Sequence, residues 1–361
     1  MTMDLITMNT LNRTARFYGA ALLMVLTVAC GGGGGGGSNN NPVSPTDPPP
    51  APNGYTQAEA KTTASLGFLT SELIFNRIQD ESSSFAYFVQ GFLSNGVSRT
   101  PGQYSNTISC VRSGSGSGTL SVVLTVTGNA SDPARAGLVP GDSLNLNYSS
   151  CDFGGIGVVK NGNAVVTSLG IYTSLGTVSP TISDFQFKYN LTTNDFDVAS
   201  GASQRIRSNG SQDIDLTSSA NASNLAIISK VMGTSTASYF RPVGASVSAS
   251  ANRLDLGFTY SAQRNISADT FELQLEGTAS LGTESASLPF AISTPTKLSG
   301  NVIAGRLVPV AGVMRTKDTT ANLLAQTTWS GGPVAVSADT NKDSSLDLNF
   351  SFTSHAFFIA Q

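Results

Sequence analysis

The sequence predicts a mainly β protein, in which a long antiparallel meander forms a sandwich or an open barrel and an amphipathic helix precedes it. From about residue 105 onward, apolar residues alternate with polar ones, which is typical of half-buried antiparallel strands. Before that point apolar residues recur every three to four positions, as on one face of a helix. The composition, with 37 glycines and only 12% charged residues in 361, suits a secreted β protein.

The first 29 residues have the layout of a secretory signal peptide. Arg13 and Arg16 precede an apolar run, FYGAALLMVLTVA, that ends in small residues just before Cys30. This run is shorter than the ~20 residues that a helix needs to span a bilayer. We therefore expect residues 1–29 to be removed as a signal peptide; an uncleaved anchor is the alternative.

Residues 26–30, Leu-Thr-Val-Ala-Cys, resemble the lipobox of bacterial lipoproteins, with Thr27 where that family most often has leucine. The resemblance implies a diacylglyceryl group on the Cys30 thiol, cleavage before Cys30 and acylation of the new amino terminus. It also implies an outer-membrane location, because Gly31 stands where an aspartate would retain the protein at the inner membrane. Several acyl chains hold a protein stably at a bilayer. We expect a lipid-anchored protein, on either the periplasmic or the cell-surface face; signal cleavage without lipid is the alternative.

Residues 30–54 predict a tether between the lipid and the folded part. Cys30 is followed by seven glycines and then by a proline-rich tract. Glycine buries no side chain that could offset its lost backbone entropy, and prolines favour an extended polyproline conformation. A coil of about 24 residues reaches on the order of 25 to 30 Å. The folded part is therefore expected to stand clear of the lipid headgroups.

Residues 55–100 form the predicted helical segment. Thr56 and Glu59 have the spacing of a capping box, and leucines and isoleucines recur at helical spacing up to Ile78. These signals predict a helix over residues 57–78. The segment FAYFVQGFL, residues 85–93, is either a second short helix or the first strand, and its aromatic side chains are expected to lie in the core.

Residues 101–361 form the predicted antiparallel β domain, in which clusters of Gly, Asn, Asp and Ser separate the strands. Two such clusters, KNGNA at 160–164 and SNGSQD at 208–213, predict turns. The helix is available to cover an open face of the sheet. The alternation is clearest in LNLNY (144–148), FQFKYNL (185–191), LDLGFTY (254–260), FELQL (271–275) and LDLNFSF (346–352).

Cys110 and Cys151 are the two cysteines left when Cys30 carries the lipid. An even pair in a compartment that permits disulfides is expected to be bridged; two free buried thiols are the alternative. The segment between them holds the strand TLSVVLTV and the turn Pro140-Gly141-Asp142. It resembles a Cys…Gly-Asp-Ser…Cys arrangement of uncharacterised proteobacterial lipoproteins, and this resemblance implies no activity.

The segment DTNKDSSLD, residues 339–347, has the spacing of an oxygen-ligand calcium loop. It differs from that loop at offset 6, which is Ser344 rather than glycine, and at offset 12, which is Phe350 rather than a carboxylate. Two interpretations stay open, a hairpin turn and a weak structural calcium site. The candidate ligands are Asp339, Asn341, Asp343, the Ser345 carbonyl and Asp347.

Charge and residue types argue against several classes of function. The chain has 20 basic and 23 acidic residues and lacks the basic patch that nucleic-acid binding requires. His355 is the only histidine and lies near the chain end, so few residues are available to form a Ser/His or Cys/His catalytic site. We expect no enzymatic activity, no catalytic residues, no nucleic-acid partner and no cofactor other than the possible calcium ion.

Three classes of function remain. The first is a noncatalytic outer-membrane lipoprotein that binds or adheres to a protein or glycan through its β domain. The second is a carrier or chaperone of an apolar ligand, with the helix as a lid over an apolar sheet face. An enzyme of unknown class is the third. A cavity lined by inward-facing strand residues would favour the carrier, and a filled core would favour the binding protein.

Overall fold

The computed structural model describes most of the chain from Thr56 onward. The predicted signal peptide and tether lie outside the described residues, and so does Cys30. The described ranges are 56–93, 101–111, 114–127, 138–152, 155, 157–170, 173–176, 184–200, 204–221, 224–240, 253–265, 268–282, 287–339 and 341–353.

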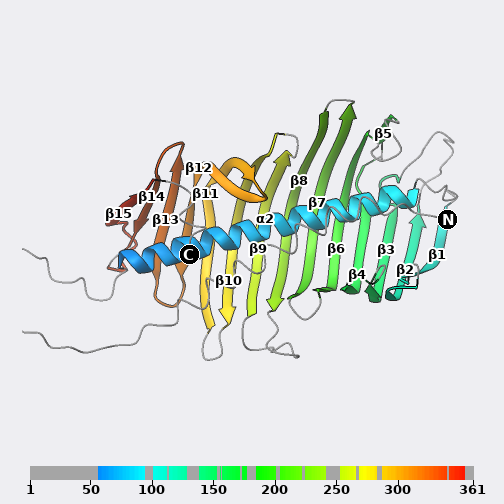
Figure 1. Cartoon of the computed structure of the whole chain (residues 1–361), viewed down its shortest axis with the longest axis horizontal. Coiled ribbons are helices and arrows are strands. Elements are labelled where there is room, and N and C mark those ends of the chain that lie inside the picture. Colours follow the sequence, from blue (N-terminus) through cyan, green and yellow to red (C-terminus); the bar gives the residue numbers. More distant parts are fainter. Residues whose placement is uncertain are drawn as a thin grey trace, which may run out of the picture.

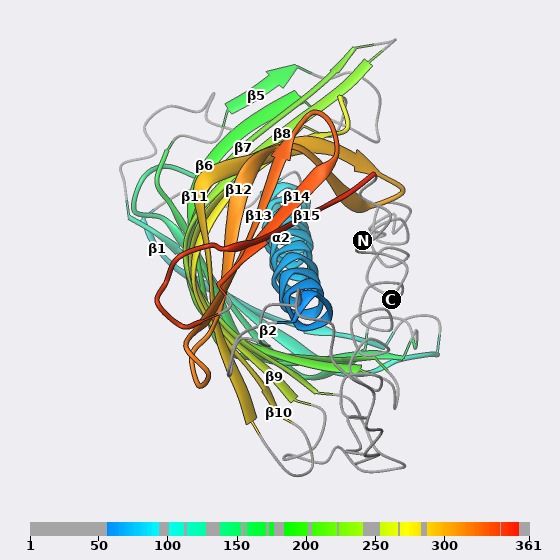
Figure 2. The ribbon, with the colours of Figure 1, turned by 90° about the vertical axis from the view of Figure 1, so that its left-hand side faces the viewer.

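One open antiparallel sheet curls around one long helix. The helix, α2 (Gln57–Leu93), lies on the concave side of the sheet and runs across the strands (Figure 1). Seen along the helix, the sheet is a trough that surrounds α2 on several sides (Figure 2). The mainly β meander and its N-terminal helix are thus confirmed, and the meander takes the form of a single open sheet.

Neighbouring strands follow chain order across this 15-stranded sheet, except that the short β5 pairs only with β6 and leaves β4 beside β6. Among the described residues, β1 and β15 lie at opposite ends of that order. The strands are β1 (Gly102–Ser109), β2 (Ser117–Val126), β3 (Ser143–Asp152), β4 (Val158–Ser168), β5 (Thr173–Gly176), β6 (Asp184–Ser200), β7 (Gln204–Asn221), β8 (Asn224–Phe240), β9 (Arg253–Asn265), β10 (Thr270–Gly282), β11 (Ser287–Ile303), β12 (Arg306–Asp318), β13 (Leu323–Ser330), β14 (Val334–Ala338) and β15 (Leu348–Phe352).

Helix α2 begins at the predicted capping box. The Thr56 amide donates to Glu59 Oε2 at 2.8 Å, and the Glu59 amide donates to Thr56 Oγ1 at 3.2 Å. The predicted helix end at Ile78 is wrong, and so is the separate element at 85–93, because α2 continues without a break to Leu93. No glycine or proline stands between these two stretches, so the polar residues there interrupt the apolar pattern without ending the helix.

The helix and the sheet share one hydrophobic core. The cluster of buried apolar residues includes Phe68, Phe75 and Ile78 of α2 together with inward-facing residues from both halves of the sheet. Every residue from Gly67 to Glu72 is buried. Six consecutive helical residues cover more than one full turn, so α2 is enclosed on all sides over this stretch. The helical segment and the β domain therefore form one packed unit.

A line of β-bulges crosses the first half of the sheet. The strand pairs β2–β3, β3–β4, β4–β6 and β6–β7 each contain a register shift, and the shifts lie beside one another. Four residues at these shifts have positive φ: Gly118, Ser150, Gly162 and Asp195. We call these four residues the bulge line. Bulges bend a strand and increase its twist, so the bulge line contributes to the curl of the trough.

The predicted turns at 160–164 and 208–213 are wrong, because these clusters lie inside β4 and β7. Gly162 has φ 88° and sits on the bulge line. Turns and bulges both need residues that tolerate positive φ. The same Asn-Gly composition therefore marks either feature, and here the strands continue through it.

The alternating segments at 144–148, 185–191, 254–260 and 271–275 all lie within strands, in β3, β6, β9 and β10. The last predicted segment, 346–352, becomes β15 from Leu348 onward. Within the part of the chain that the structure describes, no helix is long and apolar enough to cross a membrane.

Candidate functional site

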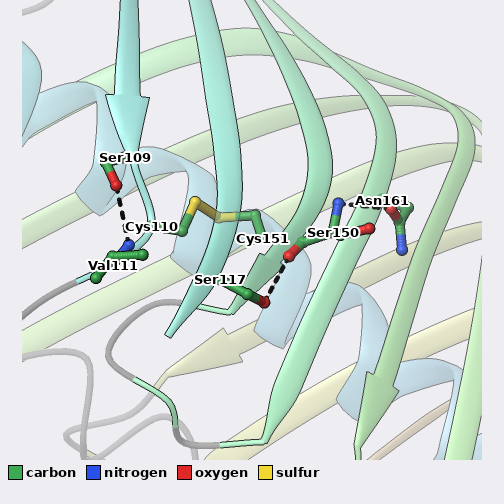
Figure 3. The surroundings of a disulfide bond; sticks show 7 residues. All are labelled: Ser109, Cys110, Val111, Ser117, Ser150, Cys151 and Asn161. Carbon is green, nitrogen blue, oxygen red and sulfur yellow. Dashed lines mark hydrogen bonds between the residues drawn. A yellow bond between two sulfur atoms is a disulfide. The ribbon is translucent and has the colours of Figure 1, made fainter. Parts of the chain in front are cut away.

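The predicted disulfide between Cys110 and Cys151 is present (Figure 3). Their Cα atoms are 5.4 Å apart, and both residues are fully buried. Cys110 follows β1 and Cys151 lies in β3, so β2 separates the two strands. Alternate strands are normally about 9.5 Å apart, so Cys110 lies unusually close to β3. Its amide donates to the carbonyl of Gly118 in β2, at 3.1 Å.

The bulge line passes beside this disulfide and is held by side-chain hydrogen bonds. The Ser150 amide donates to Asn161 Oδ1 at 2.7 Å, and Ser117 Oγ donates to the Ser150 carbonyl at 3.0 Å. Further along the line, the Asp195 amide donates to Asn209 Oδ1 at 2.6 Å. At the bulges, the amides of Ser150 and Asp195 lose their partners on the neighbouring strand, and the two asparagine side chains accept hydrogen bonds from them instead. The disulfide and the asparagines fix the same bent region.

An aromatic and cationic cluster lies next to the disulfide. Lys160 pairs with Cys151 in the strand register, and its Nζ lies 5.8 Å from the centre of the Tyr148 ring. The Tyr148 ring packs edge-on against Phe196, with ring centres 5.6 Å apart. Burial lowers the pKa of the Lys160 ammonium and raises the pKa of the Tyr148 phenol. The aromatic face offers the ammonium a cation–π contact.

The acidic segment 339–347 connects β14 to β15, and Asp339 organises it. Asp339 is fully buried. Its Oδ1 accepts the amides of Asn341 at 3.0 Å and Lys342 at 2.7 Å, and its Oδ2 accepts the Ser344 amide at 2.9 Å. Ser344 has φ 69°, the conformation that glycine supplies at offset 6 of a calcium loop. The loop has this backbone shape without glycine.

The other candidate calcium ligands make hydrogen bonds within the segment and to β14. Asp343 is exposed and accepts the Ser345 amide at 2.7 Å, a bond that lowers the pKa of its carboxyl. The Asp347 amide donates to the Ala338 carbonyl at 3.1 Å and closes the hairpin. Among the described residues, no three His, Cys, Asp or Glu side chains form a group that could hold a metal ion. The geometry of the segment is that of the hairpin turn.

Helix α2 packs against the sheet through two aromatic pairs and through a very close approach of its backbone to β12. Phe68 packs against Trp329 of β13 and Phe75 against Phe271 of β10, with ring centres 5.9 and 5.6 Å apart. At Gly67 a Cβ would lie 1.9 Å from Thr316 Oγ1 of β12. Only glycine allows the helix backbone to approach β12 this closely.

Buried hydroxyls without hydrogen-bond partners accompany this contact. Ser65 and Thr70 of α2 and Thr316 and Thr327 of the sheet are at most 1% exposed. Within the described structure, none of their hydroxyl oxygens has a hydrogen-bond partner. An unpaired buried hydroxyl costs about 1–3 kcal/mol. The contact between α2 and the sheet therefore combines aromatic packing, which stabilises it, with buried hydroxyls that lack hydrogen bonds, which weaken it.

The tip of the β11–β12 hairpin binds α2 from a second direction. Arg306 Nε donates to Glu72 Oε1 at 2.9 Å and to Oε2 at 3.0 Å, and the Leu307 amide donates to Oε1 at 2.8 Å. The Glu72 side chain is only 5% exposed. Burial raises the pKa of the Glu72 carboxyl, while Arg306 and the Leu307 amide lower it to a smaller extent.

The convex face of the sheet carries an outer polar row across β3, β4, β6 and β7. Asn163 Nδ2 donates to Asn145 Oδ1. Asn190 Nδ2 donates to Ser211 Oγ and to Asp213 Oδ1, both at 2.8 Å, and Thr192 Oγ1 donates to Asn190 Oδ1 at 2.9 Å. The outer polar row consists of Asn145, Asn163, Asn190, Thr192, Ser211 and Asp213.

Sequence reasoning missed the outer polar row, the bulge line and the Glu72–Arg306 pair. The polar positions of the alternating segments are a usable signal for the outer row, because they face away from the core. No such signal exists for Glu72 and Arg306, which are 234 residues apart in the chain. Comparisons with family models, with curated proteins and with solved structures found no match to this chain.

Proposed function

We propose that this chain is a noncatalytic, lipid-anchored protein of the outer membrane that binds or adheres to its partner through the convex face of its β domain. The observation that carries the binding part is the outer polar row. The concave face is occupied by α2 and belongs to the core, so the convex face is the broad surface left for a partner. The anchoring part depends on the lipobox resemblance at residues 26–30.

The outer polar row suits a polar partner such as a protein or a glycan. Its amides and hydroxyls are already held by one another, as in the bonds from Asn190 to Ser211 and Asp213. A surface whose side chains are fixed before binding loses less conformational entropy on association. Beside this row, Lys188 pairs with Asp215 at 3.1 Å, so the two charges balance. Hydrogen bonding rather than net charge would therefore dominate recognition.

The anchor is tested by labelling growing cells with a radioactive fatty acid. We expect the wild-type chain to take up label and the Cys30→Ala variant to remain unlabelled. Protease added to intact cells then distinguishes the two faces of the outer membrane. A mature chain with an unmodified amino terminus would contradict the proposed anchor, and a domain protected until the outer membrane is breached would contradict adhesion at the cell surface.

The binding surface is tested by placing a photo-crosslinking amino acid at exposed positions in cells that express the protein. Position 192 lies in the outer polar row, and position 349 lies on β15 in a separate polar pair, where Ser337 Oγ donates to Asn349 Oδ1 at 2.6 Å. We expect discrete adducts from position 192 and none from position 349. Both positions face outward from the sheet, so equal crosslinking would contradict a partner surface centred on the outer polar row.

A carrier of an apolar ligand is the second candidate, favoured by the partnerless hydroxyls of Ser65 and Thr70 under α2. A helix that buries uncompensated polar groups is held less firmly than close apolar packing would hold it. An acyl chain that replaced α2 would meet apolar side chains such as Leu307 and Met314. Titration of the Cys30→Ala chain with a fluorescent palmitate analogue tests this candidate; saturable binding supports it, and no binding removes it.

A further inference from the structure

The β11–β12 hairpin is sharply bent between its base and its tip. Strand β11 shifts register against β12 between Ser293 and Thr296, between Thr296 and Ser299, and between Ser299 and Gly300. At Gly300 a Cβ would lie 2.2 Å from the Val308 carbonyl oxygen, so only glycine fits at this bend. We call residues 300–309, beyond the last shift, the strap. In Figure 2 the ribbons of β11 and β12 curve over α2.

The strap contributes Val302 and Leu307 to the hydrophobic core and binds α2 through one polar cluster at its tip. Its turn, Ala304 and Gly305, has positive φ at both residues, as in a tight hairpin turn. Next to the turn, Arg306 and the Leu307 amide bind the Glu72 carboxylate at 2.8 to 3.0 Å. Asn76, one helical turn further along, donates to the Gly305 carbonyl at 3.5 Å. These four bonds join the tip of the strap to adjacent turns of the helix.

The outer face and the base of the strap are less firmly held than its inner face. Ile303 at the tip is 58% exposed and Val310 just beyond it is 44% exposed, so its outer face has no cover. The successive register shifts at its base interrupt the β11–β12 ladder. On its other edge, Asn301 is paired with β10, and the Val302 amide donates to the Asp269 carbonyl at 2.6 Å. Within the described structure, the buried hydroxyls of Ser65 and Thr70 on α2 gain no hydrogen bonds. The strap therefore adds a polar contact to the apolar packing that retains α2.

We propose that the β11–β12 strap holds α2 in the trough, with the Glu72–Arg306 pair as its latch, and that the trough opens locally when the strap lifts. The opening moves α2 and the strap together and leaves the strands β2 to β6, with their disulfide, in place. This inference does not depend on what the protein binds, although an opening trough would give an apolar ligand its entry.

The test measures how often α2 leaves the trough, with a thiol at position 65 as the reporter. Ser65 is fully buried and its hydroxyl has no partner, so Ser65→Cys is a mild change whose thiol reacts with a disulfide reagent only after opening. Cys30→Ala removes the other free thiol from the full-length chain. The latch is removed by Glu72→Ala or by Arg306→Ala, and the control is Glu272→Ala, which removes an exposed ion pair with Lys297 on the same sheet.

We expect the latch variants to label roughly tenfold faster or more than the reporter chain, and the Glu272 variant to label at the reporter's rate. Global stability is measured in parallel by urea unfolding. The proposal is overturned if labelling is unchanged by latch removal, or if it rises only as much as the global unfolding constant rises. If Glu72→Ala fails to fold, Arg306→Lys keeps the charge, loses the two-oxygen contact of Nε and is expected to give a smaller increase.

Discussion

Glu72 of α2 and Arg306 of β12 are 234 residues apart in the sequence, and the Arg306 Nε lies 2.9 Å from Glu72 Oε1. The carboxylate is almost fully buried, whereas the Arg306 side chain is 21% exposed. Burial penalises the charged carboxylate more than its partners favour it, so the pKa of Glu72 lies above its ordinary value of 4.5. This pair links the first element of the fold to the last third of the sheet.

The first prediction concerns the pH dependence of stability. A carboxyl whose folded pKa is raised binds more protons in the folded than in the unfolded state, so its contribution to stability is greatest below 4.5 and falls as pH rises through the folded pKa. Glu72→Gln removes this titration and keeps an acceptor for the Leu307 amide. We expect the stability of the wild type relative to this variant, measured by urea unfolding, to fall as pH rises above about 4.5. A difference that grows with pH would show that the ion pair outweighs burial.

The second prediction concerns the disulfide. Its partners are separated by 41 residues, and the chain-entropy estimate for such a loop is about 4 kcal/mol. We expect Cys110→Ser with Cys151→Ser to lower the free energy of unfolding by up to that amount in urea titrations. Cys30→Ala serves as the control and is expected to leave the stability of the folded part unchanged. A loss below about 1 kcal/mol would mean that neighbouring bonds, such as Ser150 to Asn161, hold the region without the bridge.

The third prediction uses two glycines with similar φ in different surroundings. Gly162 has φ 88° and a Cβ there would lie 2.1 Å from the Asp195 carbonyl oxygen, whereas Gly331 has φ 77° and nothing within 4 Å. Gly331→Ala is expected to cost about 1 kcal/mol of backbone strain. Gly162→Ala adds a clash with backbone at the bulge line and is expected to cost about 3 kcal/mol or more. Equal losses in chemical denaturation would contradict the close packing of β4 against β6.

The fourth prediction concerns the contact between α2 and β12. In an exposed helix, Gly→Ala stabilises by about 1 kcal/mol. Gly67→Ala is expected instead to destabilise by about 2 kcal/mol, because the new Cβ meets Thr316 Oγ1. Thr316→Ala removes that oxygen and should restore part of the loss in the double variant. A double-mutant cycle by thermal unfolding measures this coupling, and strictly additive effects would contradict the contact.

The fifth prediction distinguishes the hairpin turn at 339–347 from a calcium site. Asp339 is buried and accepts three amides of the loop, so Asp339→Ala is expected to lower the free energy of unfolding by about 3 kcal/mol. The exposed Asp343 serves as the matched position, where alanine should cost much less than at Asp339. We expect both values to be the same in calcium and in EDTA. Stability that rises with calcium in the wild type and not in the Asp339 variant would restore the calcium interpretation.

Local patterns were sufficient for the strands, the capping box and the disulfide. The alternation at 144–148 or 254–260 records which face of a strand is buried, and Thr56 with Glu59 needs only neighbouring backbone. The two remaining cysteines had one possible pairing. The strands and the capping box depend on residues close in sequence, and the disulfide follows from the number of cysteines, so a single sequence is enough to predict them.

The sequence by itself thus determined a helix followed by a long antiparallel meander, its bridged cysteines and the spacing that suggests a lipid anchor. Only the tertiary structure decided that the cluster at 160–164 holds a bulge and the cluster at 208–213 continues a strand, where the sequence predicted turns. It also decided that α2 runs on to Leu93 inside a trough and that Glu72 meets Arg306. One physical reason is that turns and bulges both use residues with positive φ, so the sequence does not distinguish them. The other is that the curl of the sheet decides which groups meet a buried polar side chain, and this curl depends on the twist of many strands together.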